Sequence, residues 1–425
     1  MIRNIRLLII YIAALLAIPA TAQYQTDTIP VIEGQVEVAD SLPPELPWQQ
    51  KMQQRMDELM QTKLLTTSDI GLMVWDLTDD SCLYAYHAQH RLRPASTQKV
   101  ITAISALDKL GSSHLFKTQL RYKGTIVEYR DTANNVIGRT LEGDVWCIGG
   151  MDPMFGANDM REFAYAVKEL GIDTLRGNIY ADLSFKDKDR LGEGWCWDDD
   201  NPTLTPLLME RKDGFIDKLM AQLRNAQIVL DVARGEQACP PGTIELCTRT
   251  HTMDEVLKPM MKNSNNLFAE SVFYQLANHM GGKWATAKNA RTAIQQVMTK
   301  AGIDAKAYYA ADGSGLSLYN YVSAEMEVKM LRYAYQQPDI YDHLTRSMPI
   351  AAADGTLSGR MGKSPAARNV HAKTGTVIGV SSLAGYCTTA NGHVLCFSII
   401  NQGIQNPAAG RAFQDRVCSA LCSEY

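Results

Sequence analysis

Three short polar motifs constrain this chain more than any other feature, because each stands where a regular element is predicted to begin. Ser96-Thr97-Gln98-Lys99 lies at the start of a predicted helix over residues 95–110. Ser264-Asn265-Asn266 comes just before a second predicted helix over residues 267–280, and Lys373-Thr374-Gly375-Thr376 enters a predicted strand. If the motifs act together, the fold has to bring three distant segments of the chain to one place.

The first motif combines a hydroxyl group with an amine. Residues three apart lie on one face of a helix, so Lys99 is expected beside the Ser96 hydroxyl. A serine is a weak nucleophile until a base takes its proton, and a lysine can be that base when burial or a cationic neighbour lowers its pKa. In the first helical turn, Ser96 would also have free N–H groups that favour developing negative charge. The pair therefore predicts nucleophilic catalysis, although S-x-x-K alone recurs by chance.

The other two motifs supply polar groups that could face the same site. Ser264 and Asn266 are two residues apart and would point the same way from an extended segment. The alternative is a helix N-cap, a position that favours Ser and Asn. Lys373 and Thr374 could hold a carboxylate, and Gly375 lets another backbone approach the strand edge closely. The alternative there is the start of a surface strand.

The first residues have the pattern of a secretory leader. Arg3 and Arg6 precede an apolar run over 7–18, and Ala20-Thr21-Ala22 follows as a small-residue cleavage site. This pattern predicts a signal peptide over 1–22, with a membrane anchor as the alternative, although the run is shorter than a spanning helix needs. Residues 23–47 are rich in Pro and acids, which predicts a flexible lead-in of no assigned role. No later run is long and apolar enough to span a membrane, so we expect no transmembrane segment in the mature chain and a periplasmic or external location.

Composition excludes other classes of protein. The 425 residues are 46% hydrophobic and 21% charged, which is ordinary globular usage and enough for two or three domains. The net charge of −4 argues against a nucleic-acid partner, which would favour a basic surface. The eight histidines are scattered without an H-E-x-x-H motif, so neither a catalytic metal nor a cofactor is expected.

The nine cysteines form no C-x-x-C zinc pattern, and their odd number leaves at least one thiol unpaired. Asn391-Gly392 is a strong signal for a two-residue hairpin turn. Pairing outward from that turn sets Cys387 opposite Cys396, where a disulfide could form. Two buried thiols that pack as small hydrophobic groups are the alternative.

Hydrophobic periodicity indicates a mixed α/β chain whose two ends form one unit, with the middle inserted into it. Helices are predicted at 48–64, 95–110, 158–170, 214–226, 253–261, 267–280, 285–301, 324–336 and 412–421, and strands at 70–77, 82–87, 116–122, 177–183, 383–388 and 393–400.

The motifs in this order are the signature set of β-lactamases and penicillin-binding proteins. From about Trp48 to its end, the chain resembles the low-molecular-mass class C penicillin-binding proteins, which are D-alanyl-D-alanine carboxypeptidase/endopeptidases. The resemblance also rests on Gly149-Gly150-Met151-Asp152-Pro153, Gly194-Trp195-Cys196-Trp197-Asp198-Asp199, Ala311-Asp312-Gly313-Ser314-Gly315-Leu316-Ser317 and Asp354-Gly355-Thr356-Leu357.

The resemblance implies a penicillin-binding/β-lactamase-like fold, in which a five-stranded antiparallel sheet is flanked by helices with the active site beside it. The catalytic domain would comprise residues 48–114 and 252–425, with an inserted α+β domain over 115–251. In the family this insert often carries a nested third domain. Here that part is expected to be absent or reduced to a loop at 201–212.

The resemblance also implies a role for each motif residue. Ser96 would attack the D-Ala-D-Ala carbonyl and form an acyl-enzyme, with Lys99 as its base. Ser264 and Lys373 would relay a proton to the leaving amine, and Asn266 would hold the substrate amide. Lys373 and Thr374 would bind the terminal carboxylate of the substrate, which would pass close to Gly375. The backbone N–H groups of Ser96 and Thr376 would form an oxyanion hole.

Two further positions bear on substrate choice. In relatives that read a free amino-acid centre on the stem peptide, an acidic residue precedes a proline in the insert, and Asp152 matches it. A turn-initiating Asp-Pro pair is the alternative. Those relatives often carry an arginine where this chain has Leu318, so the identity of the third stem-peptide residue stays open.

The implied partners are peptidoglycan stem peptides and β-lactam antibiotics. One competing interpretation is a serine β-lactamase, but a class A enzyme also needs a downstream glutamate, and none lies between Glu270 and Glu325. Another is a catalytically silent peptidoglycan- or penicillin-binding module. The balance of carboxypeptidase and endopeptidase activity and the oligomeric state stay open.

Overall fold

The computed structural model describes residues 45–197, 201–211 and 213–425. The predicted leader over 1–22 and nearly all of the lead-in lie outside the described residues. The helices are α1 (Trp48–Met60), α2 (Gln98–Leu110), α3 (Ala157–Lys168), α4 (Phe215–Asn225), α5 (Met253–Lys262), α6 (Asn266–His279), α7 (Ala287–Lys300), α8 (Ala324–Tyr335), α9 (Pro338–Ser347) and α10 (Pro407–Leu421). The strands are β1 (Asp69–Asp76), β2 (Ser81–Tyr86), β3 (Leu115–Arg130), β4 (Val136–Ile148), β5 (Thr174–Asp182), β6 (Val229–Glu236), β7 (Ile244–Thr252), β8 (His371–Val377), β9 (Val380–Thr388) and β10 (Val394–Gln402).

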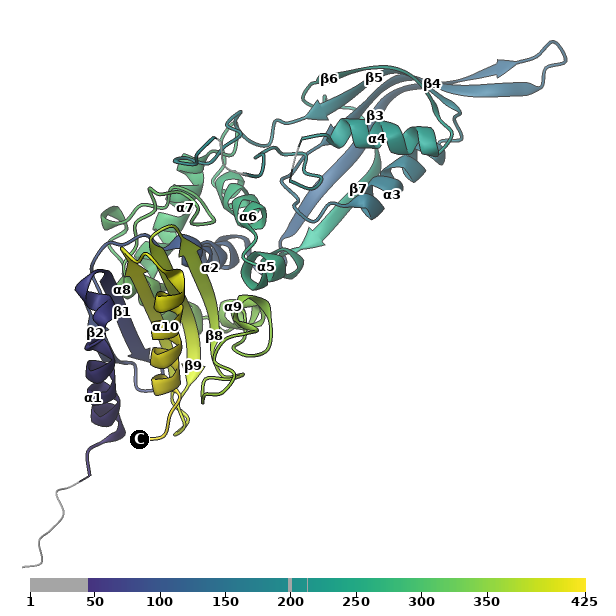
Figure 1. Cartoon of the computed structure of the whole chain (residues 1–425). Helices are drawn as coiled ribbons and strands as arrows, with labels where there is room; N and C mark the ends of the chain where they lie inside the picture. The colour runs from purple at the N-terminus through teal and green to yellow at the C-terminus, as the bar shows by residue number, and fades with distance from the viewer. Residues whose placement is uncertain (1–44, 198–200, 212) are drawn as a thin grey trace, which may run out of the picture. The chain divides into compact units, whose positions relative to one another are not determined.

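The two ends of the chain meet in one five-stranded sheet with the order β2-β1-β10-β9-β8 (Figure 1). Every neighbouring pair in it is antiparallel. β9 and β10 are buried along nearly their whole length, because helices cover both faces of the sheet. The antiparallel sheet predicted from the sequence is therefore present, and it joins β1 directly to β10.

Each face of this sheet is covered by its own group of helices (Figure 1). On one face, Met52 and Met56 of α1 and Phe413 of α10 pack into a single hydrophobic cluster. On the other face, residues of α2, α6 and α8 share a larger cluster. Burial of one such side chain contributes about 1.5–3 kcal/mol relative to leaving it exposed. The helix that carries Lys99 is thus held on the sheet by its own apolar residues.

The middle of the chain forms a second five-stranded sheet, with the order β6-β5-β4-β3-β7. β4, β5 and β6 run parallel to one another, whereas β3 is antiparallel to β4 and to β7. A separate hydrophobic cluster, which includes Phe163 of α3 and Leu219 of α4, packs against it. The chain enters this sheet after α2 and returns at α5. On this basis we propose that residues 115–251 form an inserted domain, and that 48–114 and 252–425 form the catalytic domain.

The β9–β10 hairpin corrects the predicted cysteine pairing. The Thr389 N–H group donates to the carbonyl of His393 at 2.9 Å, so the turn has three residues, and Gly392 has a left-handed φ of +91°. Cys387 therefore faces Leu395, and Cys396 faces Tyr386. A shift of one residue sends the two side chains to opposite faces of the sheet. Both thiols are free and buried in different clusters, so the predicted Cys387–Cys396 disulfide is wrong.

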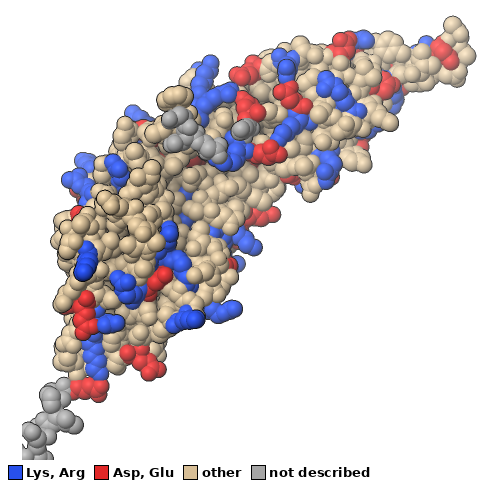
Figure 2. All heavy atoms as spheres, viewed as in Figure 1, with Lys and Arg blue, Asp and Glu red and all other residues tan. Residues whose placement is uncertain are grey.

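Two further features concern the beginning of α2 and the surface. The predicted helix over 95–110 instead begins with a short 3-10 turn, Ala95–Thr97, in which Ala95 has a φ of +49°. Basic and acidic side chains are interspersed over the face seen in Figure 2. In the part of the chain that the structure describes, no helix is both long and apolar enough to cross a membrane.

Candidate active site

Ser96 and Lys99 lie side by side at the start of α2. The Lys99 Nζ atom is 2.9 Å from Ser96 Oγ, as the spacing of three residues predicts. Ser96 is partly exposed, whereas Lys99 is completely buried. The hydroxyl can therefore be reached from outside, while the amine beside it is removed from solvent.

Burial lowers the pKa of Lys99 to about 7, against the opposing negative charges of Asp312 and Glu270. A buried ammonium loses its hydration, and this favours the neutral amine. The amine is held at three points, because Nζ also lies 2.8 Å from Asn266 Oδ1 and 2.8 Å from the carbonyl oxygen of Ser314. An amine with a pKa near neutrality, in contact with a serine hydroxyl, is suited to act as a general base.

The second and third motifs meet beside this pair. Lys373 Nζ lies 2.8 Å from Ser264 Oγ, and the side chain of Lys373 is fully buried. Burial lowers the pKa of Lys373 well below its usual range, and the positive charge of nearby Lys99 lowers it further. Ser264 has a left-handed φ of +58°, which is uncommon for a residue with a side chain. Ser264 lies between the end of α5 and the start of α6. From this position its side chain contacts Lys373, and the side chain of Asn266 contacts Lys99.

The predicted N-cap role of the second motif belongs to a different residue. Asn265 caps α6, since its Oδ1 accepts a hydrogen bond from Leu267 N–H at 3.0 Å. That leaves the side chains of Ser264 and Asn266 available to contact Lys373 and Lys99. The capping interpretation therefore holds for Asn265, and the catalytic role of Ser264 and Asn266 stays a prediction.

Gly375 lets strand β8 pack directly against Ser96. A Cβ atom added there would lie 2.1 Å from Ser382 Oγ and 2.9 Å from the backbone nitrogen of Ser96. Both separations are too short for any side chain, so only glycine fits. Next to it, the Thr374 hydroxyl donates to Thr356 Oγ1 at 2.7 Å, and Thr376 is exposed.

The loop over residues 311–317 contributes directly to the site. Its Ser314 carbonyl accepts the bond from Lys99, and its amide groups of Gly313 and Ser314 donate to the buried carboxyl of Glu270 at 3.2 and 2.9 Å. Asp312 accepts bonds from the amides of Gly315 and Ser317 and from Trp195 Nε1. The stretch around Ser314 was part of the family resemblance, but the contact of its carbonyl with Lys99 could not be predicted from the sequence. Glu270 carried no sequence signal, because an acid inside a helix belongs to none of the motifs.

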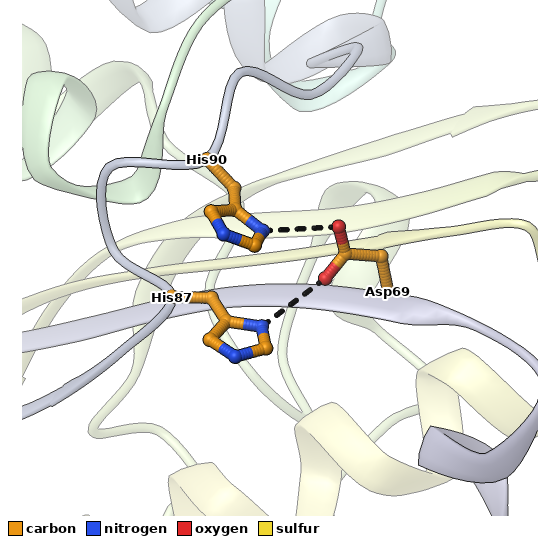
Figure 3. Close-up of side chains that lie close together, drawn as sticks. All are labelled: Asp69, His87 and His90. Carbon is orange, nitrogen blue, oxygen red and sulfur yellow. Dashed lines mark hydrogen bonds and ion pairs between the residues drawn. The ribbon is translucent and has the colours of Figure 1, made fainter. Parts of the chain in front are cut away.

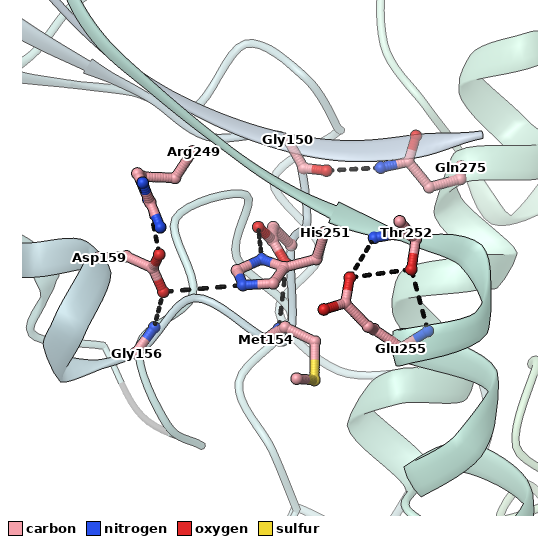
Figure 4. A network of polar contacts seen from close by, with 10 residues as sticks. Gly150, Met154, Gly156, Asp159, Arg249, His251, Thr252, Glu255 and Gln275 are labelled. Carbon is pink, nitrogen blue, oxygen red and sulfur yellow. Dashed lines mark hydrogen bonds and ion pairs between the residues drawn. The ribbon is translucent and has the colours of Figure 1, made fainter. Parts of the chain in front are cut away.

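Asp152 lies in a separate polar network. Its side chain is fully buried and accepts a hydrogen bond from the Met154 N–H group at 3.0 Å. Its other oxygen lies 2.8 Å from His251 Nδ1 at the end of β7, close to Asp159 (Figure 4). Burial raises the pKa of Asp152, and the bond from His251 opposes that shift. The structure thus pairs Asp152 with His251, and its role in substrate binding stays a prediction.

The chain is similar to a defined family of peptidases. The sequence profile of the D-Ala-D-Ala carboxypeptidase 3 (S13) family matches residues 52–213 and 207–421. A D-alanyl-D-alanine carboxypeptidase of Actinomadura sp. (strain R39) is 27% identical over 473 residues, which cover 88% of this chain and 85% of that protein.

Solved structures show the same fold. Penicillin binding protein 4 (dacB) from Haemophilus influenzae has a TM-score of 0.75 at 22% identity, over 86% of this chain and 98% of that chain. A predatory endopeptidase from Bdellovibrio bacteriovorus, Bd3459, has a TM-score of 0.53 at 16% identity, over 82% of this chain and 91% of that chain. The predicted penicillin-binding fold is confirmed.

Proposed function

The chain belongs to the D-Ala-D-Ala carboxypeptidase 3 (S13) family and is a serine-type D-Ala-D-Ala peptidase, and we propose that Ser96 is its nucleophile and Lys99 the base. One observation carries this assignment. The only lysine within the first motif contacts the serine hydroxyl at 2.9 Å and has a pKa lowered to about 7 by burial.

In the first half of the reaction, the neutral Lys99 amine accepts the proton of Ser96. The Ser96 oxygen then attacks the carbonyl carbon between the two terminal D-Ala residues. Backbone N–H groups of Ser96 and Thr376 stabilise the oxyanion, a contribution worth about 2.7–4 kcal/mol per donor in other enzymes. The close packing of β8 on the Ser96 backbone at Gly375 supports this arrangement.

The bond to the terminal D-Ala breaks next, and its amine has to gain a proton. Ser264 and Lys373 are hydrogen-bonded at 2.8 Å and relay to the leaving amine the proton that Lys99 took from Ser96. Water then attacks the acyl-enzyme and gives up a proton to the neutral Lys99 amine. That proton passes to the Ser96 oxygen as its bond to the acyl group breaks and the shortened peptide is released.

The substrate would be held by groups that flank the nucleophile. Thr374 and Lys373 bind the terminal carboxylate, the Asn266 side chain orients the substrate amide, and the extended peptide lies along β8 past Gly375. We extend the proposal to cross-linked peptides, since the Bdellovibrio protein with the same fold is an endopeptidase. Asp152 would contact the far end of the stem peptide.

We also propose export of the enzyme by the leader over 1–22 to the periplasm, where peptidoglycan is found.

A β-lactam would acylate Ser96 in the same way as the peptide does. The Haemophilus penicillin binding protein 4 has also been solved in complex with a β-lactam, which supports that expectation.

The test is mass spectrometry of the mature protein after penicillin treatment, paired with D-alanine release from a stem pentapeptide. We expect a long-lived adduct on the peptide that contains Ser96, together with D-alanine release, and neither in Ser96→Ala. A short-lived adduct without D-alanine release would indicate a β-lactamase instead. Neither adduct nor release would indicate a silent binding module and overturn the mechanism.

A further inference from the structure

Two histidines and an aspartate that are not part of the site described above converge at one edge of the antiparallel sheet. Asp69 is the first residue of β1, and His87 and His90 follow the last residue of β2, its antiparallel neighbour. Both imidazole rings turn a nitrogen toward the Asp69 carboxylate (Figure 3). His90 Nδ1 lies 3.1 Å from Asp69 Oδ2, and His87 Nδ1 lies 3.4 Å from Asp69 Oδ1.

These separations fit the ligand shell of a transition-metal ion. Zinc binds imidazole nitrogen and carboxylate oxygen at about 2.0–2.2 Å, so neighbouring ligands of a tetrahedral site lie about 3.3–3.6 Å apart. One ligand atom from each of the three residues lies within 4.8 Å of the others. The two imidazoles are stacked at 4.4 Å, and both are about half-exposed, with 46% and 51% of their side chains accessible. An ion from solvent could therefore reach them, and water could complete the coordination.

A second cluster in the same sheet shows what a purely structural arrangement looks like. Asp76 is fully buried, and its carboxylate accepts bonds from the Thr78 and Asp79 amides as well as from His393 Nδ1. One of its oxygens, Oδ1, is thus occupied by two backbone donors, and only Oδ2 faces the imidazole. The Asp69 carboxylate differs, because in the described part of the chain its only hydrogen-bond partners are the two imidazoles.

The backbone places the histidines for this contact. The amide of His90 donates to the carbonyl of His87 at 3.0 Å, which closes a tight turn. His87 itself has a left-handed φ of +43°, and its ring stacks on Tyr86. Downstream, the Arg93 amide donates to Gln402 Oε1, and Gln402 pairs with Asp69 across the sheet. The segment that leads to Ser96 is thereby attached to the sheet at both of its ends.

We propose that Asp69, His87 and His90 bind one divalent transition-metal ion such as Zn²⁺, which combines imidazole nitrogen and carboxylate oxygen ligands with water. The ion would link the beginning of β1 to the segment between β2 and Ser96. It takes no part in the peptidase reaction, and the three residues are separate from the groups assigned to that reaction. The proposed metal site can therefore be tested independently of the proposed peptidase function.

The test is isothermal titration of Zn²⁺ into the untagged, chelator-treated mature protein. We expect one equivalent to bind, and Asp69→Asn, His87→Ala and His90→Ala each to weaken binding at least about 10-fold, since loss of even an outer-shell partner costs about 10–100-fold. His393→Ala is the matched control, because it removes a histidine from the other cluster. Its affinity for Zn²⁺ should equal that of the wild type.

A spectroscopic measurement reports the coordination of the ion directly and so complements the measured affinity. Co²⁺ added in place of Zn²⁺ should give visible absorption bands of a four-coordinate site in the wild type and in His393→Ala, and these should disappear in His90→Ala. Circular dichroism of each variant checks that it is folded. Wild-type binding no tighter than that of His90→Ala, or equal loss in His393→Ala, would overturn the proposal and leave the cluster as ordinary hydrogen bonds.

Discussion

Lys99 Nζ donates a hydrogen bond to Asn266 Oδ1 at 2.8 Å, although the two residues are 167 positions apart in the chain. This contact joins the first motif to the second. With Asn266 as one partner, the Lys99 amine also contacts the Ser96 hydroxyl and the Ser314 carbonyl at the same time. The nucleophile and its base are therefore oriented by tertiary contacts as well as by the spacing along one helix.

Replacing Lys99 by alanine should abolish acylation while the protein stays folded. The substitution removes the proposed base of Ser96, and general bases contribute about 10²–10⁴-fold to rate. Covalent labelling by a fluorescent penicillin measures the loss, and far-UV circular dichroism checks the fold. Lys109→Ala, which changes a half-buried lysine at the other end of α2, is the control and should label normally. Normal labelling of Lys99→Ala would show that Lys99 is not the base of Ser96.

Acylation should become faster as pH rises through about 7. Lys99 has a pKa lowered to about 7 by burial, so below that pH it is increasingly protonated and cannot accept the Ser96 proton. The expected rate rises about tenfold per pH unit on the acid side and levels off above neutrality. Stopped-flow measurement of the second-order acylation rate over the stability range gives the profile. A rate that is flat, or that falls with rising pH in this range, would contradict Lys99 as the base.

Gly375→Ala should strongly reduce acylation. The added methyl group would meet Ser382 Oγ at 2.1 Å and the Ser96 nitrogen at 2.9 Å, so β8 has to move away from the nucleophile. Misplacement by about 1 Å costs on the order of 10²-fold in rate. The penicillin acylation rate measures this effect. Gly359→Ala is the matched control, since nothing lies within 4 Å of its added methyl group. Equal rates for the two variants would show that β8 tolerates a side chain at 375.

Glu270→Ala should lower both stability and acylation. The change leaves the buried amides of Gly313 and Ser314 without their acceptor, at a cost of about 1–3 kcal/mol for each unpaired group. It also frees the loop whose Ser314 carbonyl holds Lys99. Glu270→Gln keeps one acceptor and should be intermediate in both respects. Thermal melting and the penicillin acylation rate test whether both quantities fall in the order wild type, Glu270→Gln, Glu270→Ala. A Glu270→Ala variant as active as the wild type would contradict the role of this loop.

Much of the fold was predictable because its signals are local. The amphipathic pattern of α1, the Asn-Gly turn between β9 and β10, and the apolar runs of β1 and β10 each predicted an element within a few residues of its observed position. By contrast, α9 and the strands β4, β6 and β7 were missed. β6 and β7 are largely exposed or half-buried along their length, so they carry little hydrophobic periodicity. Their strand conformation comes from pairing with neighbours.

The hairpin register shows how far a local signal extends. Asn391-Gly392 predicted a turn, and a turn is there. The loop has three residues instead of two, and this shift of one residue separates Cys387 from Cys396. Which of the two lengths forms depends on which side chains the sheet buries on each face, and that is decided by the helices packed against it.

The three motifs and the element boundaries at which they stand could be found in the sequence, because helix spacing and turn propensity act over a few residues. The burial of Lys99 and Lys373, the contacts of the Ser314 carbonyl and Glu270 around Lys99, and the packing of β8 on Ser96 arise only in the folded protein. Those properties depend on desolvation and on contacts between residues far apart in the chain. A pKa near neutrality for Lys99 exists only once the surrounding helices and loop have excluded water from it.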